Sequence, residues 1–543
     1  MNKRATIAVL LAVLATPLLL ASAEGEEGGD AAVPHYEYVV IGPAPQAIER
    51  SELKHYDEVK AALDEKMAAE LGFTIDVTDL SQSGMAVNQL IQLSAAGGDP
   101  IHIVQGTGEM GGATEWAPMW IPVEGLVDEH APDYLELVND YNPLLLETFS
   151  DKDGNLAGLP HLVRMRGLIY LFNQDLIDKL GVELPPLPEG RFDLTFDHLE
   201  QLGEAFNREV PDGMGIMWYH TFKTFLGAFE DNISMSNWNP QGYVNYFDQE
   251  EGIWKDWVDS EYYEDSVRLF DKFLKKGYYW HSLAEPAGTE RDRGFINGTI
   301  LGRDGQGWYG GNPTYKEWID EDPANETKIL VYGVASKKQP IWSAGFRGLF
   351  FTKRNTQEQV EKYLQFINWM SRDEANYNLA RYGIEGLTFE IEQTAGGDMS
   401  LHIPEAEMTD TIQEPYQLMG FEHRWLLGNY DRKYERAGLT FAGNEIHDLF
   451  DALNAQNSTI EPYVFARFVY TPEEQQKVAD SFAFITSEFF DGVLMDRDMD
   501  VEEKIARGRE IYAEFHKMGG GIYIDKTNEY YLANPGLRPL PLN

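Results

Sequence analysis

The sequence predicts an α/β protein built on mostly parallel sheets. From Tyr36 onward, short segments rich in β-branched residues alternate with longer segments of helical periodicity, which is the pattern of strands covered by helices. A comparable alternation follows Pro160. At about 100–200 residues per domain, the 543 residues provide for two to four domains with large apolar cores.

The first run of elements lies in the N-terminal part of the chain. It is expected to comprise, in order, a strand over 35–42, a helix over 51–71, a strand over 73–80, a short helix over 85–98 and a strand over 101–105. Ser51 is the expected cap of the first helix, in which Leu53, Val59, Leu63 and Met67 recur near helical spacing. A glycine pair stops the second helix.

The second run follows Pro160 and passes into a largely helical C-terminal part. We expect a strand feeding a short helix over 166–185, an amphipathic helix over 194–209, strands over 330–335 and 348–354, a long helix over 356–383 and another over 501–521. Thr195 is the expected cap of the 194–209 helix. Trp254, Trp257 and Trp369 stand in helix-like context and are predicted to be core residues.

The composition excludes several classes of function. Asp and Glu total 89 against 44 Lys and Arg, a net charge of −45, and such a surface repels nucleic-acid phosphates and anionic lipid. The chain contains no cysteine, which rules out disulfides, cysteine-based zinc sites, iron–sulfur clusters and thiol nucleophiles. We expect no cofactor.

Residues 1–23 have the features of a secretory signal peptide. Lys3 and Arg4 precede an apolar stretch, and Ala21-Ser22-Ala23 forms a cleavage site of the A-x-A type. The alternative is an uncleaved membrane anchor, for which the apolar run is short. Residues 24–35 are predicted to be a flexible acidic leader, and a lipobox cysteine is absent. The sequence therefore predicts a periplasmic protein.

Residues 106–111 match the G-x-G-x-x-G pattern after a predicted strand. A dinucleotide site needs a helix that begins at those glycines, whereas Pro118 and Pro122 would break any helix here, and Glu109 would lie among the phosphate charges. We therefore interpret the segment as a loop at the carboxyl edge of a sheet, which is where open α/β sheets bind ligands.

No motif for a metal site or a catalytic site stands out. Residues 151–155 resemble the start of a calcium loop, but Leu156 and Leu162 occupy its glycine and glutamate positions, so a surface turn is favoured. His102 and His161 are interpreted as structural, and no metal is expected. With 89 acidic residues, a glycosidase-like carboxylate pair can arise by chance, so a hydrolase stays open as an alternative.

Aromatic residues in predicted loops and at the ends of elements indicate a carbohydrate site. Sugars stack their C–H faces on such rings, while carboxylate and guanidinium groups hydrogen-bond to the hydroxyls. The candidate ligand-binding residues are Glu109, Trp116, Trp120, Arg166, Trp218, Tyr219, Trp308, Tyr309, Trp342 and Arg347. The sequence leaves open whether Arg164, Arg166 and Arg347 form a basic pocket for a uronate.

The order of several segments resembles the extracellular solute-binding proteins of family 1, the capture components of ABC importers. The resemblance covers most of residues 36–525. Its matching segments are 57–77, 88–104, 151–160, 167–185, 194–206, 295–302, 363–390 and 501–521, the last two being most like the large oligosaccharide-binding branch. His102 and Ala157 replace an aspartate and an aromatic that are usual in the family. Residues 207–217 lack the acidic pattern of the calcium loop found in some members.

The resemblance implies a periplasmic-binding-protein fold of two α/β lobes with a hinge and a ligand cleft between them. The expected first lobe is 36–160 plus about 345–395, and the second is 161–344 plus about 396–543. The implied function is non-enzymatic capture of an oligosaccharide or sugar by a monomer that delivers it to ABC permease transmembrane subunits. The alternatives are a secreted carbohydrate-active hydrolase and a peptide-binding importer component.

Overall fold

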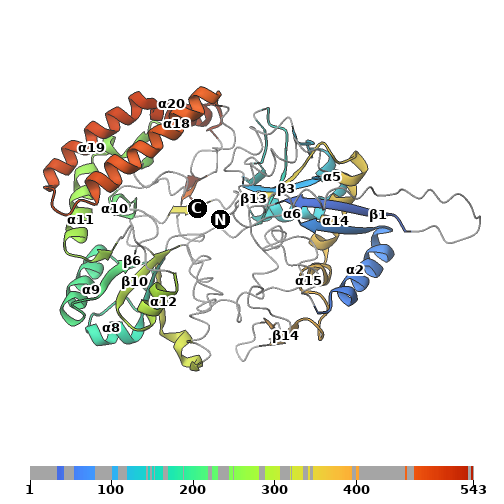
Figure 1. Ribbon diagram of the computed structural model, residues 1–543, viewed down its shortest axis with the longest axis horizontal. Coiled ribbons are helices and arrows are strands. Elements are labelled where there is room, and N and C mark those ends of the chain that lie inside the picture. Colours follow the sequence, from blue (N-terminus) through green and yellow to red (C-terminus); the bar gives the residue numbers. More distant parts are fainter. Residues whose placement is uncertain are drawn as a thin grey trace, which may run out of the picture.

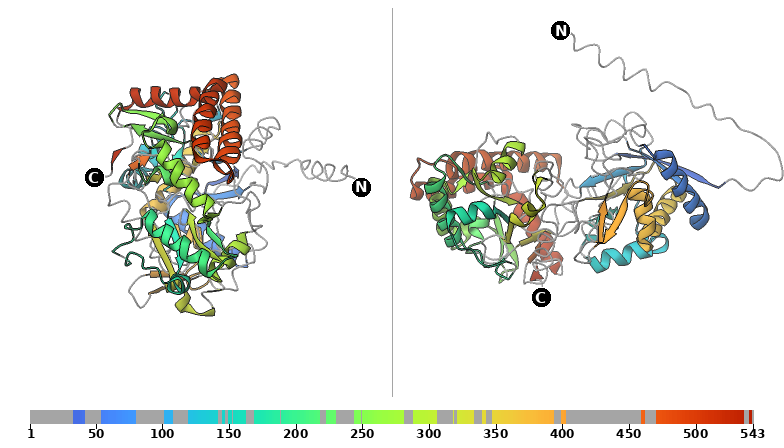
Figure 2. Two further views of the ribbon diagram at one scale, coloured as in Figure 1. Left: turned by 90° about the vertical axis from the view of Figure 1, so that its left-hand side faces the viewer. Right: turned by 90° about the horizontal axis from the view of Figure 1, so that it is seen from below.

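The computed structural model shows two α/β bodies that lie side by side (Figures 1 and 2). The residues it describes are 33–41, 54–79, 101–107, 119–141, 145–146, 149–151, 153–162, 169–187, 189–217, 223–229, 244–248, 250–280, 288–305, 318, 321–333, 340–342, 347–393, 399–402, 459–461, 470–535 and 540–541. The predicted signal peptide and most of the predicted leader therefore lie outside the described residues.

The first body is built on a five-stranded sheet in the order β2-β1-β3-β13-β4. Its strands are β1 His35–Ile41, β2 Thr74–Asp79, β3 Ile103–Thr107, β4 Leu159–Pro160 and β13 Arg347–Phe351. β1 pairs in parallel with β2 and β3, whereas β13 runs antiparallel to β3 and β4. All strands but β13 thus point one way, as the alternating sequence predicts.

Helices on both sides of this sheet close the first core. They are α2 Tyr56–Leu71, α5 Leu126–His130, α6 Pro132–Tyr141, α14 Gln357–Arg372 and α15 Glu374–Tyr382, and the hairpin β14 Glu390–Gln393 with β15 Met399–His402 follows. Val59, Leu63 and Met67 are buried along α2, as their spacing predicts. One continuous hydrophobic core joins residues from Tyr38 to Leu162 with residues from Leu349 to Phe389.

Two helix boundaries differ from those predicted. Residues 54–55 form a turn, and α2 begins at Tyr56 after His55, which makes no side-chain cap. The long helix predicted over 356–383 is two helices, because Asp373 adopts an extended conformation and its side chain accepts from the Ala375 amide to cap α15. A short polar side chain competes here with the helical backbone.

The second body has the sheet order β11-β5-β10-β6-β9. Its strands are β5 Ile169–Asn173, β6 Met214–Met217, β9 Tyr279–Trp280, β10 Ile300–Gly305 and β11 Ile329–Gly333. β10 pairs in parallel with β6, and β6 with β9, while β5 runs antiparallel to both of its neighbours. The antiparallel strand lies inside the sheet, as β13 does in the first body.

The other elements of the second body surround this sheet. They are α8 Gln174–Leu180, α9 Phe196–Glu209, α10 Lys223–Leu226, α11 Tyr263–Lys275, α12 Gly288–Ile296, the 3-10 helices η4 Trp257–Asp259 and η5 Pro323–Lys328, and the hairpin β7 Asn245–Asp248 with β8 Ile253–Asp256. Thr195 caps α9 through a capping box, as predicted.

A helical cap from the C-terminal part of the chain, residues 472–533, completes the second body. It consists of α18 Pro472–Ile485, the π-helix η9 Thr486–Leu494, α19 Val501–Phe515, the π-helix η10 His516–Gly520 and α20 Gly521–Ala533. The second hydrophobic core joins residues from Tyr170 to Tyr332 with residues from Ile485 to Tyr531. The chain thus builds each core from two separate stretches of sequence.

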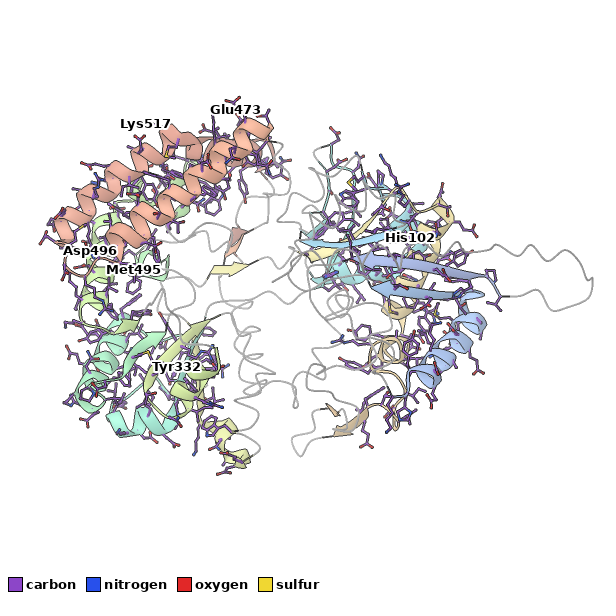
Figure 3. The ribbon with its side chains drawn as sticks, viewed as in Figure 1. His102, Tyr332, Glu473, Met495, Asp496 and Lys517 are labelled. Atoms are coloured by element: carbon purple, nitrogen blue, oxygen red, sulfur yellow. The ribbon has the colours of Figure 1, made fainter. Side chains whose placement is uncertain are left out.

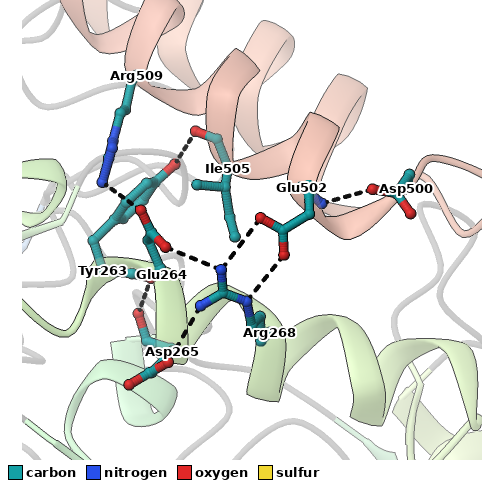
Figure 4. Close-up of polar contacts among 9 residues, drawn as sticks. Tyr263, Glu264, Asp265, Arg268, Asp500, Glu502, Ile505 and Arg509 are labelled. Atoms are coloured by element: carbon teal, nitrogen blue, oxygen red, sulfur yellow. Dashed lines mark hydrogen bonds and ion pairs between the residues drawn. The ribbon is translucent and has the colours of Figure 1, made fainter.

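Ion pairs attach this cap to α11. Arg268 bonds Glu502 through Nε–Oε1 at 3.1 Å and Glu264 through Nη2–Oε2 at 3.0 Å, and Arg509 bonds Glu264 at 3.1 Å (Figure 4). These groups are partly exposed, so each pair contributes little to stability. The buried Lys504 lies deeper in the same interface, with its Nζ 2.8 Å from Asp271 Oδ1.

His516 makes the stability of this cap depend on pH. Its Nε2 lies 2.5 Å from Asp256 Oδ2 on β8, and that hydrogen bond raises the pKa of His516 above its ordinary value. The carboxylates of Asp256, Asp259 and Asp525 also favour the protonated imidazole. The stabilisation is therefore full below the unfolded pKa of about 6.5 and is lost as the pH rises through the higher folded value.

We expect the wild-type melting temperature to fall between pH 6 and pH 9 by more than that of the variant His516→Gln. Burial raises the pKa of Asp259, and both proteins keep this carboxyl group. Differential scanning calorimetry at pH 6, 7, 8 and 9 measures the effect. Parallel profiles for the two proteins would contradict it.

Candidate functional site

The carboxyl edge of the first sheet collects several segment ends. β1 ends there at Ile41 and β3 at Thr107, while β13 begins there, with Arg347 paired to Thr107. β4 ends at the same edge, because Pro160 pairs with Gly348. With β2, which runs parallel to β1 and ends at Asp79, four strands leave the sheet at this edge and one enters.

The second sheet has the same arrangement. β6 ends at Met217 and β10 at Gly305, and β5 enters the edge at Ile169, which pairs with both Gly305 and Gly333. Gly333 is the last residue of β11. The two sheets therefore present equivalent edges.

Two stretches of chain run from one carboxyl edge to the other, and the second of them contains β12 (Pro340–Trp342). One runs from the end of β4 to the start of β5, and the other from the end of β11 to the start of β13. Fully extended, the link from Pro160 to Ile169 spans at most roughly 30 Å. The carboxyl edges of the two sheets must therefore lie near each other. The arrangement of the two bodies in Figure 1 agrees with this.

In the sequence, most predicted site residues stand near the strands that end or begin at these edges. Of the ten, Glu109, Trp116, Arg166, Trp218, Tyr219, Trp308 and Tyr309 lie outside the described residues. In sequence, Glu109 follows β3, Arg166 precedes β5, Trp218 and Tyr219 follow β6, and Trp308 and Tyr309 follow β10. Trp342 is the last residue of β12 (Pro340–Trp342), and Arg347 is the first of β13.

The prediction for Trp120 is wrong. Its side chain is 2% exposed, and its ring stacks on Phe350 of β13 with centroids 5.2 Å apart. A bridge from Trp120 to Thr352 holds the backbone against the sheet. A ring enclosed in this way offers no face to a sugar, so Trp120 is part of the first core. The core assignments of Trp254, Trp257 and Trp369 are confirmed.

Two buried polar pairs near the edge of the second sheet were not predicted from the sequence. The guanidinium of Arg303 on β10 pairs with the Asp292 carboxylate of α12, and both side chains are almost completely buried. The hydroxyls of Tyr170 on β5 and Tyr279 on β9 share a hydrogen bond. An arginine inside a short apolar strand is the signal that could have indicated the first pair, since a buried charge needs a partner.

His102 and the turn at 151–155 are confirmed as structural features. His102 Nδ1 accepts a hydrogen bond of 3.0 Å from the Val39 amide, between β1 and β3 (Figure 3). Burial lowers the pKa of His102, which favours this neutral acceptor form. In the turn at 151–155, Asp151 Oδ1 accepts from the amides of Asp153 and Asn155, and Gly154 has a positive φ of 88°.

Three further observations concern the described part of the chain. Its carboxylates and histidines include no group of three that could hold a metal ion. None of its helices combines the length and apolar character that a membrane span requires. A groove of about 570 Å³ lies between α2 and α15, lined by Ala62, Leu379 and Phe389 among others, away from the carboxyl edge.

Comparison by sequence finds no relatives: no family model matches the chain, and no curated protein matches it. Comparison of structures does. The N-glycan transport solute binding protein NgtS from Streptococcus pneumoniae matches with a TM-score of 0.61 over 92% of this chain and 100% of its own, at 13% identity. The chain has the periplasmic-binding-protein fold.

Two further proteins of this fold are similar over the same share of the chain. The alginate-binding protein AlgQ2, solved without calcium ion, has a TM-score of 0.57 at 13% identity, with 98% of its own chain covered. The S. pneumoniae ABC-transporter substrate binding protein FusA, solved in complex with kestose, has a TM-score of 0.53 at 16% identity, with 99% of its chain covered. The predicted α/β class and binding-protein fold are confirmed.

Proposed function

We propose that this protein is a non-enzymatic solute-binding protein that captures an oligosaccharide or sugar for an ABC importer. The observation that carries the proposal is the likeness of nearly the whole chain to NgtS. NgtS and FusA have also been solved in complex with Man1GlcNAc and kestose respectively. We assign the two bodies to the two predicted lobes, with the ligand between their facing carboxyl edges.

Binding in such a site would use aromatic stacking supported by hydrogen bonds. The segments bordering the edges carry Trp116, Trp218 and Trp308, whose rings would stack on sugar faces, and Arg166 and Arg347, which would donate to hydroxyls. A ligand that touches both lobes only in the closed form stabilises that form, so closure is a shift of population. The closed protein would then dock on permease transmembrane subunits.

The proposal also includes the localisation and the oligomeric state of the protein. Residues 1–23 would direct export and be removed, leaving a periplasmic protein without a lipid anchor. It would act as a monomer. Its strong negative charge would not be part of the site, because the ring-bearing segments rather than the acidic surface recognise the ligand.

A thermal-shift screen tests the function directly. We expect at least one member of a panel of neutral and acidic oligosaccharides to raise the melting temperature, with about 2.7 kcal/mol of stabilisation at 100-fold over Kd. Chromatography of the same mixtures should show the sugar unchanged. Turnover of the sugar would instead favour the hydrolase, and stabilisation only by peptides would favour the peptide-binding alternative.

We expect Trp308→Ala and Trp218→Ala each to weaken binding of the oligosaccharide found in that screen by about tenfold, equivalent to about 1.4 kcal/mol. Isothermal titration calorimetry measures the change. Trp308→Phe keeps an aromatic face and should retain most of the affinity. Unchanged affinity in both alanine variants, with unchanged melting temperatures of the free proteins, would refute the assignment of these rings to the site.

A further inference from the structure

A small sheet links the stretches of chain that cross between the two bodies. The chain passes between elements of the two bodies from β4 to β5, from β11 to β13 and from β15 to α18. The last two passages contain described strands: β12 lies between β11 and β13, and β16 Thr459–Glu461 lies between β15 and α18. β12 and β16 pair in parallel, with Pro340 opposite Thr459 and Trp342 opposite Glu461. The third strand of this crossover sheet is β17 Leu540–Pro541, near the C-terminus, which pairs antiparallel with β16.

The crossover sheet lies between the bodies in Figure 1, where the C-terminal end of the chain is marked beside it. β16 is its central strand, with β12 on one side and β17 on the other. β17 follows α20 of the second body in the chain and pairs with β16, not with a strand of either main sheet. Its pairing therefore adds a restraint that the crossings alone do not have.

β17 is connected to the second body through α20, the helix that precedes it in the chain. The Asn528 side chain of α20 accepts from the Trp254 amide at 2.6 Å and donates to the Trp254 carbonyl at 2.9 Å. Tyr531 is buried against Phe247 and Trp254 of the β7–β8 hairpin. From the end of α20 at Ala533, the chain to Leu540 reaches at most roughly 25 Å.

We propose that β17 is a brace: it fastens the crossover sheet to the second body, so that the sheet moves with that body when the lobes open or close. Without β17, β16 would become an edge strand with unpaired backbone groups, held only by β12. The rotation between lobes would then be shared by both sides of the sheet. With β17 in place, the rotation is confined to the connections that lead from the sheet to the first body.

The brace bears on the proposed site, since it rests on the same two-lobe closure. Trp342 ends β12 in the crossover sheet, and Arg347 begins β13 in the first body. If the crossover sheet follows the second body, these two predicted ligand residues belong to different moving parts although they are close in sequence. A ligand bound by both would then report directly on closure.

The test measures the distance between the bodies in the absence of ligand. Because the chain has no cysteine, spin labels can be placed uniquely at Glu129→Cys on α5 and Lys179→Cys on α8, both exposed. Pulsed electron–electron double resonance gives the distribution of label distances. We compare the full chain, a chain ending at Leu537, which lacks β17, and a matched control ending at Pro541, which keeps it.

We expect the distribution to broaden at least twofold in the chain ending at Leu537 and to stay unchanged in the chain ending at Pro541. Hydrogen exchange of the amides at 340–342 and 459–461 should accelerate only in the former. Should that chain fail to fold, the full-length variant Leu540→Pro removes one backbone donor of β17 and should broaden the distribution partially.

Equal widths in a folded protein with and without β17 would overturn the brace, even if exchange at 459–461 accelerates. The result is independent of sugar binding, which the thermal-shift screen measures separately. The two experiments together therefore distinguish failure of the brace from failure of the proposed function.

Discussion

Replacing Asp292 by alanine is expected to lower the free energy of unfolding of the second body by about 3–5 kcal/mol. The Asp292 carboxylate and the Arg303 guanidinium are 1% and 2% exposed, so the ion pair is enclosed between β10 and α12. Removing the carboxylate takes this negative charge away from a guanidinium that stays almost completely buried. Desolvation of that charge, rather than loss of one hydrogen bond, makes the effect large.

The double variant Asp292→Ala/Arg303→Met separates these two causes. Because it removes both charges and keeps an apolar chain in place of the arginine stem, it should be more stable than Asp292→Ala alone. Urea denaturation followed by circular dichroism measures all four proteins of the cycle. A double variant as unstable as the sum of the two single variants would show that the pair contributes nothing beyond packing.

The local elements of the fold follow from the sequence because their causes are local. β-Branched alternation predicts β1, and the helical spacing of Val59, Leu63 and Met67 predicts the buried face of α2. The break at Asp373 was missed because the apolar pattern continues across it. The hydrogen bond of such a side-chain cap competes with continuation of the helix. Hydrophobic periodicity does not report the difference in free energy between the two.

The sequence predicts which segments lie at the candidate site, because these segments follow strand ends, but it does not predict which side chains face the site. Segments after β3, β6 and β10 can be assigned to a carboxyl edge from the strand order alone. Whether a given ring is exposed depends on contacts with distant parts of the chain, as Trp120 and its partner Phe350 illustrate. The Arg303–Asp292 pair is likewise a tertiary contact, since the two residues lie on different elements.

The equivalent test in the first body is Gly348→Ala, which we expect to cost about 3 kcal/mol through overpacking. A Cβ at this position of β13 would lie 2.2 Å from Phe149 Cε1 and 2.4 Å from the Leu159 carbonyl oxygen. The Phe149 ring is fully buried against Phe350, and the carbonyl belongs to β4, whose pairing with β13 fixes it. Calorimetry should therefore show a lower melting temperature for the first body.

Adding Phe149→Leu to Gly348→Ala distinguishes the two contacts. The smaller side chain removes the clash with the ring and leaves the clash with the backbone, so the double variant should regain only part of the loss. Full recovery would show that the ring alone excludes a side chain from this position. Because Gly348 and Asp292 lie in separate bodies, their effects on the free energy of unfolding should add when combined, whereas a coupling energy would mean that the two sites interact across the bodies.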